Sequence, residues 1–150
     1  MASGWSAVER MGALMSEASI QGSCLCGAVG FEIRAPFLFF QYCHCGRCRK
    51  SSGSSHGANL LLKANQFGWI RGENHVRRYE LPTAEYFCNG FCDICGSSLP
   101  WRARNGKLFV VPAGALDDDP GVTPTRNIFW DSRACWCRSA ADLPTFSAEA

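Results

Sequence analysis

The sequence predicts a mainly β fold, and three observations support this prediction. After an irregular start, short apolar and aromatic segments alternate closely with Gly, Pro and Asn, which favour turns. No window shows a sustained helical period. Within residues 28–34, Val29, Phe31 and Ile33 alternate with polar neighbours, which is the period-two pattern of a half-buried strand.

Apolar runs bounded by turn residues predict the other strands. These runs cover residues 37–42, 58–62, 67–71, 76–81, 85–91, 98–103 and 107–111. Asn105-Gly106 predicts a type I′ hairpin turn between the last two strands. Residues 117–124 are too polar and proline-rich to predict regular structure.

The length of 150 residues fits one domain, which we expect to span residues 20–150. Residues 1–19 are small, polar and irregular, and we interpret them as a disordered leader. Glu9 and Glu17 argue against the alternative of a transit peptide, since such peptides are poor in acidic residues.

The chain has 10 cysteines and no pattern typical of an export signal, so we expect a cytoplasmic protein whose thiols bind metal or react. No apolar run reaches the roughly 20 residues that a membrane-spanning helix needs. The formal charge of +2 counts thiols as neutral. Metal-bound thiolates would remove this positive charge, so it gives no argument for a nucleic-acid partner.

Two cysteine pairs predict a closed zinc site. On extended chain, the spacing of Cys24 and Cys26 points both thiols the same way. The turn in Cys92-Asp-Ile-Cys95 lets both of its sulfurs meet one ion, and Gly96 can take the positive φ that such a turn often needs. Joined across a sheet, the four thiols would form a structural zinc site that contributes folding free energy.

A third group, Cys43, Cys45 and Cys48, is predicted on a loop between strands and is one ligand short of a closed site. Catalytic zinc has three protein ligands and one open position, so this group indicates a second, open site. A fourth ligand could still come from His44, His56, Cys88, Cys135 or Cys137. Other thiol pairings and an iron–sulfur cluster also remain open.

Plainer interpretations exist for several of these residues. Cys88, Cys135 and Cys137 can be interpreted as small buried hydrophobic residues rather than as metal ligands. We expect His44 to point away from the metal, because it lies between two ligands. The run from Arg49 to Gly53 is either a solvated turn or a set of cations that would suit a substrate carboxylate.

Four segments together carry a family resemblance. They are Gly22-Ser-Cys24-Leu-Cys26-Gly27, Cys43-His-Cys45-Gly-Arg-Cys48-Arg49, Phe91-Cys92-Asp-Ile-Cys95-Gly96 and Gly114-Ala-Leu116-Asp117, with a weaker match over residues 132–136. In this order and spacing, the sequence resembles the glutathione-dependent formaldehyde-activating enzyme family, which includes centromere protein V-like proteins. The resemblance implies a zinc-containing fold of two β-sheets arranged as a tent.

The resemblance also implies two zinc ions per chain. The positions of Cys24, Cys26, Cys92 and Cys95 would hold structural zinc, and those of Cys43, Cys45 and Cys48 catalytic zinc. The implied activity is that of a carbon–sulfur lyase, which forms S-(hydroxymethyl)glutathione from glutathione and formaldehyde or acts on a related adduct. A non-catalytic zinc module that binds glutathione or a protein partner is the alternative.

The resemblance suggests roles for five further residues. Arg49 and Lys50 are candidates for binding the glutathione carboxylates, and Ser51, Ser52 or His56 for orienting the aldehyde oxygen.

Three positions depart from the family pattern. Family members commonly have His where Asn127 stands and Pro where Cys135 stands, and Cys88 is an addition. Loss of an imidazole at position 127 could remove a proton carrier.

Overall fold

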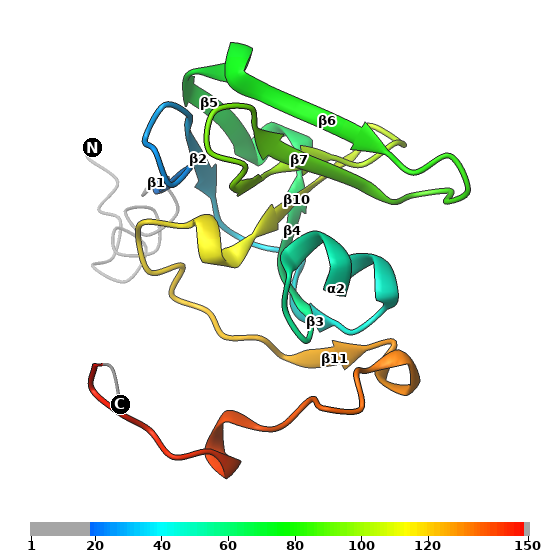
Figure 1. Ribbon diagram of the computed structural model, residues 1–150. Coiled ribbons are helices and arrows are strands. Elements are labelled where there is room, and N and C mark those ends of the chain that lie inside the picture. The colour runs from blue at the N-terminus through cyan, green and yellow to red at the C-terminus, as the bar shows by residue number, and fades with distance from the viewer. Residues whose placement is uncertain (1–18, 149–150) are drawn as a thin grey trace, which may run out of the picture.

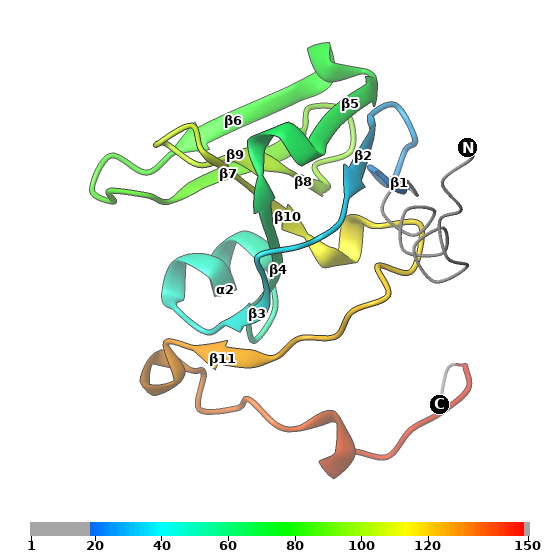
Figure 2. The ribbon, with the colours of Figure 1, turned by 180° about the vertical axis from the view of Figure 1, so that it is seen from behind.

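The structure is a computed structural model that describes residues 19–148 (Figures 1 and 2). Its first sheet has the order β1-β2-β5, formed by β1 (Ser19–Ser23), β2 (Gly30–Arg34) and β5 (Phe67–Arg71). Both pairings are antiparallel. In β2 and just before it, Val29, Phe31 and Ile33 have no exposed surface, so the predicted alternation is confirmed.

The second sheet has five strands in the order β11-β3-β4-β10-β9. Its members are β11 (Arg126–Ile128), β3 (Phe39–Cys43), β4 (Gly57–Lys63), β10 (Leu108–Pro112) and β9 (Trp101–Arg102). Only the pairing of β11 with β3 is parallel in this sheet. Sequence patterns do not predict β11, which follows the irregular segment 117–124.

The third sheet contains β6 (Val76–Glu80), β7 (Cys88–Cys92) and β8 (Ser98–Leu99) in that order. Pro100 separates β8 from β9, and because proline lacks an N–H group it interrupts a ladder of hydrogen bonds. The chain therefore passes from the third sheet into the second at this residue. The mainly β fold is confirmed and is consistent with the expected two-sheet fold, whereas the tent arrangement stays a prediction.

The core lies between the sheets. Phe31, Ile33, Leu60, Leu62 and Leu99 have no exposed surface and pack in one cluster. Partly buried aromatic rings extend this cluster: the rings of Phe67 and Phe109 stack with centroids 4.0 Å apart. Burial of these side chains holds together the strands whose ends carry the cysteines.

A short α-helix corrects the prediction that the Cys43–Cys48 segment is a loop. Helix α2 covers Gly46–Ser52, so Cys48 is helical and Cys45 caps the helix start by accepting a hydrogen bond from the Cys48 N–H, 3.5 Å away. Gly53, with φ of 64°, ends the helix in the left-handed conformation. The helix was missed because a polar helix of only seven residues produces no detectable helical period.

Five single-turn 3₁₀ helices complete the regular structure. They are η1 (Ala64–Gln66), η2 (Glu73–His75), η3 (Ala113–Ala115), η4 (Trp130–Ser132) and η5 (Ala140–Asp142). Within residues 19–148, no helix has the length and apolar character needed to cross a bilayer.

The turn between β9 and β10 differs from the prediction. A type I′ turn needs positive φ at both central residues. Here Gly106 has φ of 71°, but Asn105 does not share this conformation. Ala103 donates to the Leu108 carbonyl at 2.8 Å, which makes the loop four residues long, and its geometry needs the left-handed conformation only at the glycine.

Two domain predictions are not tested. The expected leader, residues 1–19, lies outside the described residues except for Ser19, which begins β1. The assignment of residues 20–150 to one domain likewise stays a prediction.

Candidate functional site

The structure brings Cys24, Cys26, Cys92 and Cys95 into one group, with all four sulfurs within 4.8 Å of one another. The Cys24 and Cys26 sulfurs are 3.5 Å apart, and those of Cys26 and Cys92 are 3.9 Å apart. Tetrahedral zinc with its usual Zn–S bonds would separate its sulfur ligands by about 3.8 Å. All four thiols are free, so their geometry and chemistry fit a zinc ion.

Two similar turns form this group. Gly27 donates to the Cys24 carbonyl and Gly96 to the Cys92 carbonyl, both at 2.9 Å, and each glycine has φ of 75°. Polar hydrogens also point at the sulfurs. Hydrogen bonds from Ser97 lower the pKa of Cys95 to about 5, which favours the thiolate that a metal binds.

Cys43, Cys45 and Cys48 form the second group, again with all sulfurs within 4.8 Å of one another. Cys43 is the last residue of β3, Cys45 caps α2, and Cys48 lies in the first turn of α2. A hydrogen bond with Cys48 lowers the pKa of Cys43 to about 6, and the same bond raises the pKa of Cys48. Cys43 thus loses its proton readily, whereas Cys48 resists losing its own. A bound cation would relieve this resistance, so the donor set fits a metal.

No fourth Cys, His, Asp or Glu within residues 19–148 joins this three-thiol group. His44 instead pairs with Asn127, whose Oδ1 lies 2.9 Å from Nε2. The Cys88 sulfur lies 2.9 Å from the Arg78 guanidinium. Of the proposed additional ligands, these two therefore have partners elsewhere. We expected His44 to point away from the metal, and its hydrogen bond to Asn127 agrees with this.

His44 is held tightly against β11. It is only 2% exposed, its N–H donates to the Ile128 carbonyl at 3.0 Å, and Trp130 packs edge-on against its ring. Because the Asn127 side-chain oxygen can only accept, Nε2 carries the proton. Nδ1 is buried with no hydrogen-bond partner among residues 19–148. Trp130 carried no signal in the sequence, whereas Asn127 stood out only as a departure from the family pattern.

Replacing Asn127 by leucine is expected to lower the free energy of unfolding by about 1–3 kcal/mol, because the buried Nε2–H of His44 would lose its acceptor. Urea denaturation measures this change. Asn127→His restores a polar partner and should cost less. Equal losses in the two variants would show that the hydrogen bond does not matter for stability.

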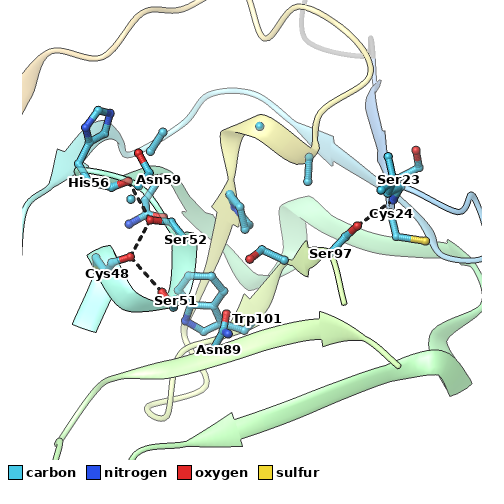
Figure 3. A pocket seen from close by; sticks show the side chains of 18 of the residues that line it. Ser23, Cys24, Cys48, Ser51, Ser52, His56, Asn59, Asn89, Ser97 and Trp101 are labelled. Carbon is cyan, nitrogen blue, oxygen red and sulfur yellow. Dashed lines mark hydrogen bonds between the residues drawn. The ribbon is translucent and has the colours of Figure 1, made fainter. Parts of the chain in front are cut away.

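A cavity of about 690 Å³ lies between the two thiol groups (Figure 3). Cys48 lines it on the α2 side, and Ser23 and Cys24 line it on the β1 side. Its size is in the range of small-molecule sites. The lining residues are Ser23, Cys24, Leu25, Cys48, Ser51, Ser52, Ser54, His56, Gly57, Ala58, Asn59, Asn89, Ser97, Ser98, Trp101, Pro112, Gly114, Ala115 and Asp117.

Three of the five predicted substrate-binding residues line this cavity. They are Ser51, Ser52 and His56, whereas Arg49 and Lys50 lie on α2 but are not among its lining residues. Sequence reasoning missed Asn59, Asn89, Trp101 and Asp117. Asn59 did offer a signal in the sequence, because it is a polar residue in the otherwise apolar run of β4. The structure buries it, with only 8% of its surface exposed.

The hydroxyl hydrogens near Cys48 already have acceptors. Ser51 donates to the Cys48 carbonyl at 3.2 Å, and Ser52 has the same carbonyl at 2.8 Å and the His56 carbonyl at 3.0 Å (Figure 3). Their oxygens can therefore accept from a ligand without disturbing α2. The His56 ring packs against Tyr42, and burial lowers its pKa, which favours the neutral imidazole.

The chain is similar to known proteins over most of its length. Residues 19–132 match the family described as glutathione-dependent formaldehyde-activating enzyme. A Halomonas elongata protein provisionally named as such an enzyme is 30% identical over 124 residues, which is 78% of each chain. A crystal structure of a Rhodobacter sphaeroides protein shares the fold with a TM-score of 0.54 and 23% identity, covering 72% of this chain and 99% of that one. The chain therefore belongs to the glutathione-dependent formaldehyde-activating enzyme family.

Proposed function

We propose that this protein is a carbon–sulfur lyase that forms, or cleaves, the adduct between glutathione and formaldehyde. The observation that carries the proposal is the position of Cys48, which belongs to the three-thiol group and also lines the cavity. A substrate in the cavity can therefore reach that group. Family membership supports glutathione and formaldehyde as the reactants.

The proposal includes two zinc ions per chain. Cys24, Cys26, Cys92 and Cys95 would hold the structural ion, and Cys43, Cys45 and Cys48 the catalytic ion. Zinc held by these three thiolates would be a weak Lewis acid because of the negative charge of its ligands. It would therefore suit the binding of an incoming thiol as thiolate better than the activation of water.

The chain's own residues would position the reactants. In the forward reaction a sulfur–carbon bond forms, the carbonyl π bond breaks, and the proton lost by the thiol ends on the former carbonyl oxygen. Neutral His56, at the edge of the cavity, is a candidate to carry this proton. The hydrogen bonds from Ser51 and Ser52 to the Cys48 carbonyl lie within α2, whereas the contact of the Ser52 hydroxyl with the His56 carbonyl, at 3.0 Å, ties the end of the helix to the segment before β4.

Exchange spectroscopy by NMR tests the proposal with the zinc-loaded protein. The rate of exchange between free glutathione and its formaldehyde adduct should rise in proportion to protein concentration. Metal analysis of the same sample should give two zinc ions per chain. Because the addition also proceeds without an enzyme, the rate without protein is the reference. A rate that stays at this reference would contradict the enzyme proposal and favour a zinc module that only binds.

A further inference from the structure

The two ends of the cavity differ in the groups that line them. Cys48 marks one end, and Asp117 lies at the other, beside Ser23. Among the lining residues of the described chain, Asp117 is the only Asp, Glu, Lys or Arg. The Asp117 end therefore suits a cationic group, and no arginine or lysine lines the wall to recognise an anionic one.

The chain holds the Asp117 carboxylate in place and leaves one oxygen available. The Asp117 N–H donates to the Gln21 carbonyl at 2.9 Å, and the Ser23 hydroxyl donates to Oδ1 at 3.0 Å. Within residues 19–148, Oδ2 accepts no hydrogen bond. Asp118 differs, because its Oδ2 accepts from the Gln21 N–H at 2.8 Å. Of these two carboxylates, only that of Asp117 combines a place in the cavity wall with a free acceptor oxygen.

A second polar group lies between the two ends. Asn59 is 92% buried, lines the cavity near Ser52 and His56, and its amide has no hydrogen-bond partner within the described chain (Figure 3). Its amide atoms are not among the buried unpaired side-chain atoms of the described chain, so they open to the cavity and are available to a ligand. An amide both donates and accepts, and these are the properties that complement a peptide group.

From this arrangement we infer that the Ser23–Asp117 end is a binding subsite for the ammonium group of a peptide thiol. The inference rests on the proposed function. With the substrate sulfur at Cys48, a peptide group meets the Asn59 amide and the terminal ammonium meets Asp117. Glutathione has this order of groups, since one peptide bond separates its thiol-bearing residue from the residue that carries the ammonium. Selectivity then comes from the ammonium group, while the carboxylates face hydroxyls or solvent.

Isothermal titration of the zinc-loaded protein with glutathione and with N-acetylglutathione tests this subsite. Acetylation removes the ammonium charge and leaves the thiol and both carboxylates. The wild type should bind glutathione roughly tenfold more tightly than the acetylated form, as expected for one charge-assisted hydrogen bond. In Asp117→Asn, glutathione affinity should fall by about the same factor and that of the acetylated form should not change.

Asp119→Asn is the matched control. Asp119 belongs to the same acidic run but does not line the cavity, and its Oδ1 accepts from the Gly121 N–H. The preference for glutathione should persist in this variant. Equal affinities for the two thiols in the wild type, a comparison that needs no variant, would overturn the subsite. So would a preference that survives in Asp117→Asn. Either result leaves the proposed function intact if adduct exchange is still accelerated, whereas a wild type that binds neither thiol removes both.

Discussion

Cys48→Ser should reduce the protein-dependent rate of adduct exchange by about 100-fold or more, because replacing even the outer partners of metal ligands costs 10–100-fold. Cys48 is the member of the three-thiol group that lines the cavity. A serine hydroxyl is a far weaker metal ligand than a thiolate at neutral pH. NMR exchange measures the rate, and metal analysis should show zinc falling from two ions to one.

Cys135→Ser is the control for this variant. Cys135 is exposed and lies outside both thiol groups, so its replacement should leave rate and zinc content unchanged. Cys48→Ser should still unfold cooperatively, because the four-thiol site and the core do not include Cys48. A wild-type rate in Cys48→Ser would show that the chemistry does not use this group.

Cys92→Ala should prevent stable folding. Cys92 is 1% exposed, ends β7 and meets Cys26, which lies 66 positions earlier in the chain. A structural zinc ion contributes about 10–16 kcal/mol of binding free energy. The net stability of a domain is only about 5–15 kcal/mol, so the loss of one ligand threatens all of it. Circular dichroism during urea denaturation should show no cooperative transition.

Cys88→Ala offers a matched comparison for Cys92→Ala. Cys88 lies on the same strand and is equally buried, but it contacts Arg78 and does not belong to the four-thiol group. Its replacement should lower the free energy of unfolding by only about 1 kcal/mol, a typical value for a single substitution. If the four-thiol group holds the proposed zinc, treating the wild type with a chelator should reproduce the Cys92→Ala behaviour. Similar unfolding midpoints in the two variants would mean that the four-thiol group does not stabilise the fold.

Local patterns were enough to predict the strands that bury one face. Strand β5 has the bounds expected from residues 67–71, and β2 shows the predicted alternation. The spacing of the cysteines likewise predicted which thiols lie together, since CxC and CxxC fix ligand geometry over a few residues.

The remaining features depend on contacts that local patterns do not contain. Strand β11 has only three residues and exists because it pairs with β3, more than 80 positions earlier. Helix α2 depends on a cysteine cap and a terminal glycine rather than on an apolar face. The cavity wall combines Asn59, Asn89 and Asp117 from three distant segments, so only the folded chain shows that they face one space.

The parallel pairing of β11 with β3 also bears on the order in which the protein can assemble. All four thiols of the first group are present once the chain reaches Cys95. The segment around the second group stays without its last strand until Ile128, whose carbonyl binds the His44 N–H, has been synthesised. On the proposed assignment of the two zinc ions, a nascent chain would therefore acquire its structural ion while the three-thiol group still lacks its supporting strand. Biogenesis would then load the ion needed for folding first and the ion needed for chemistry last.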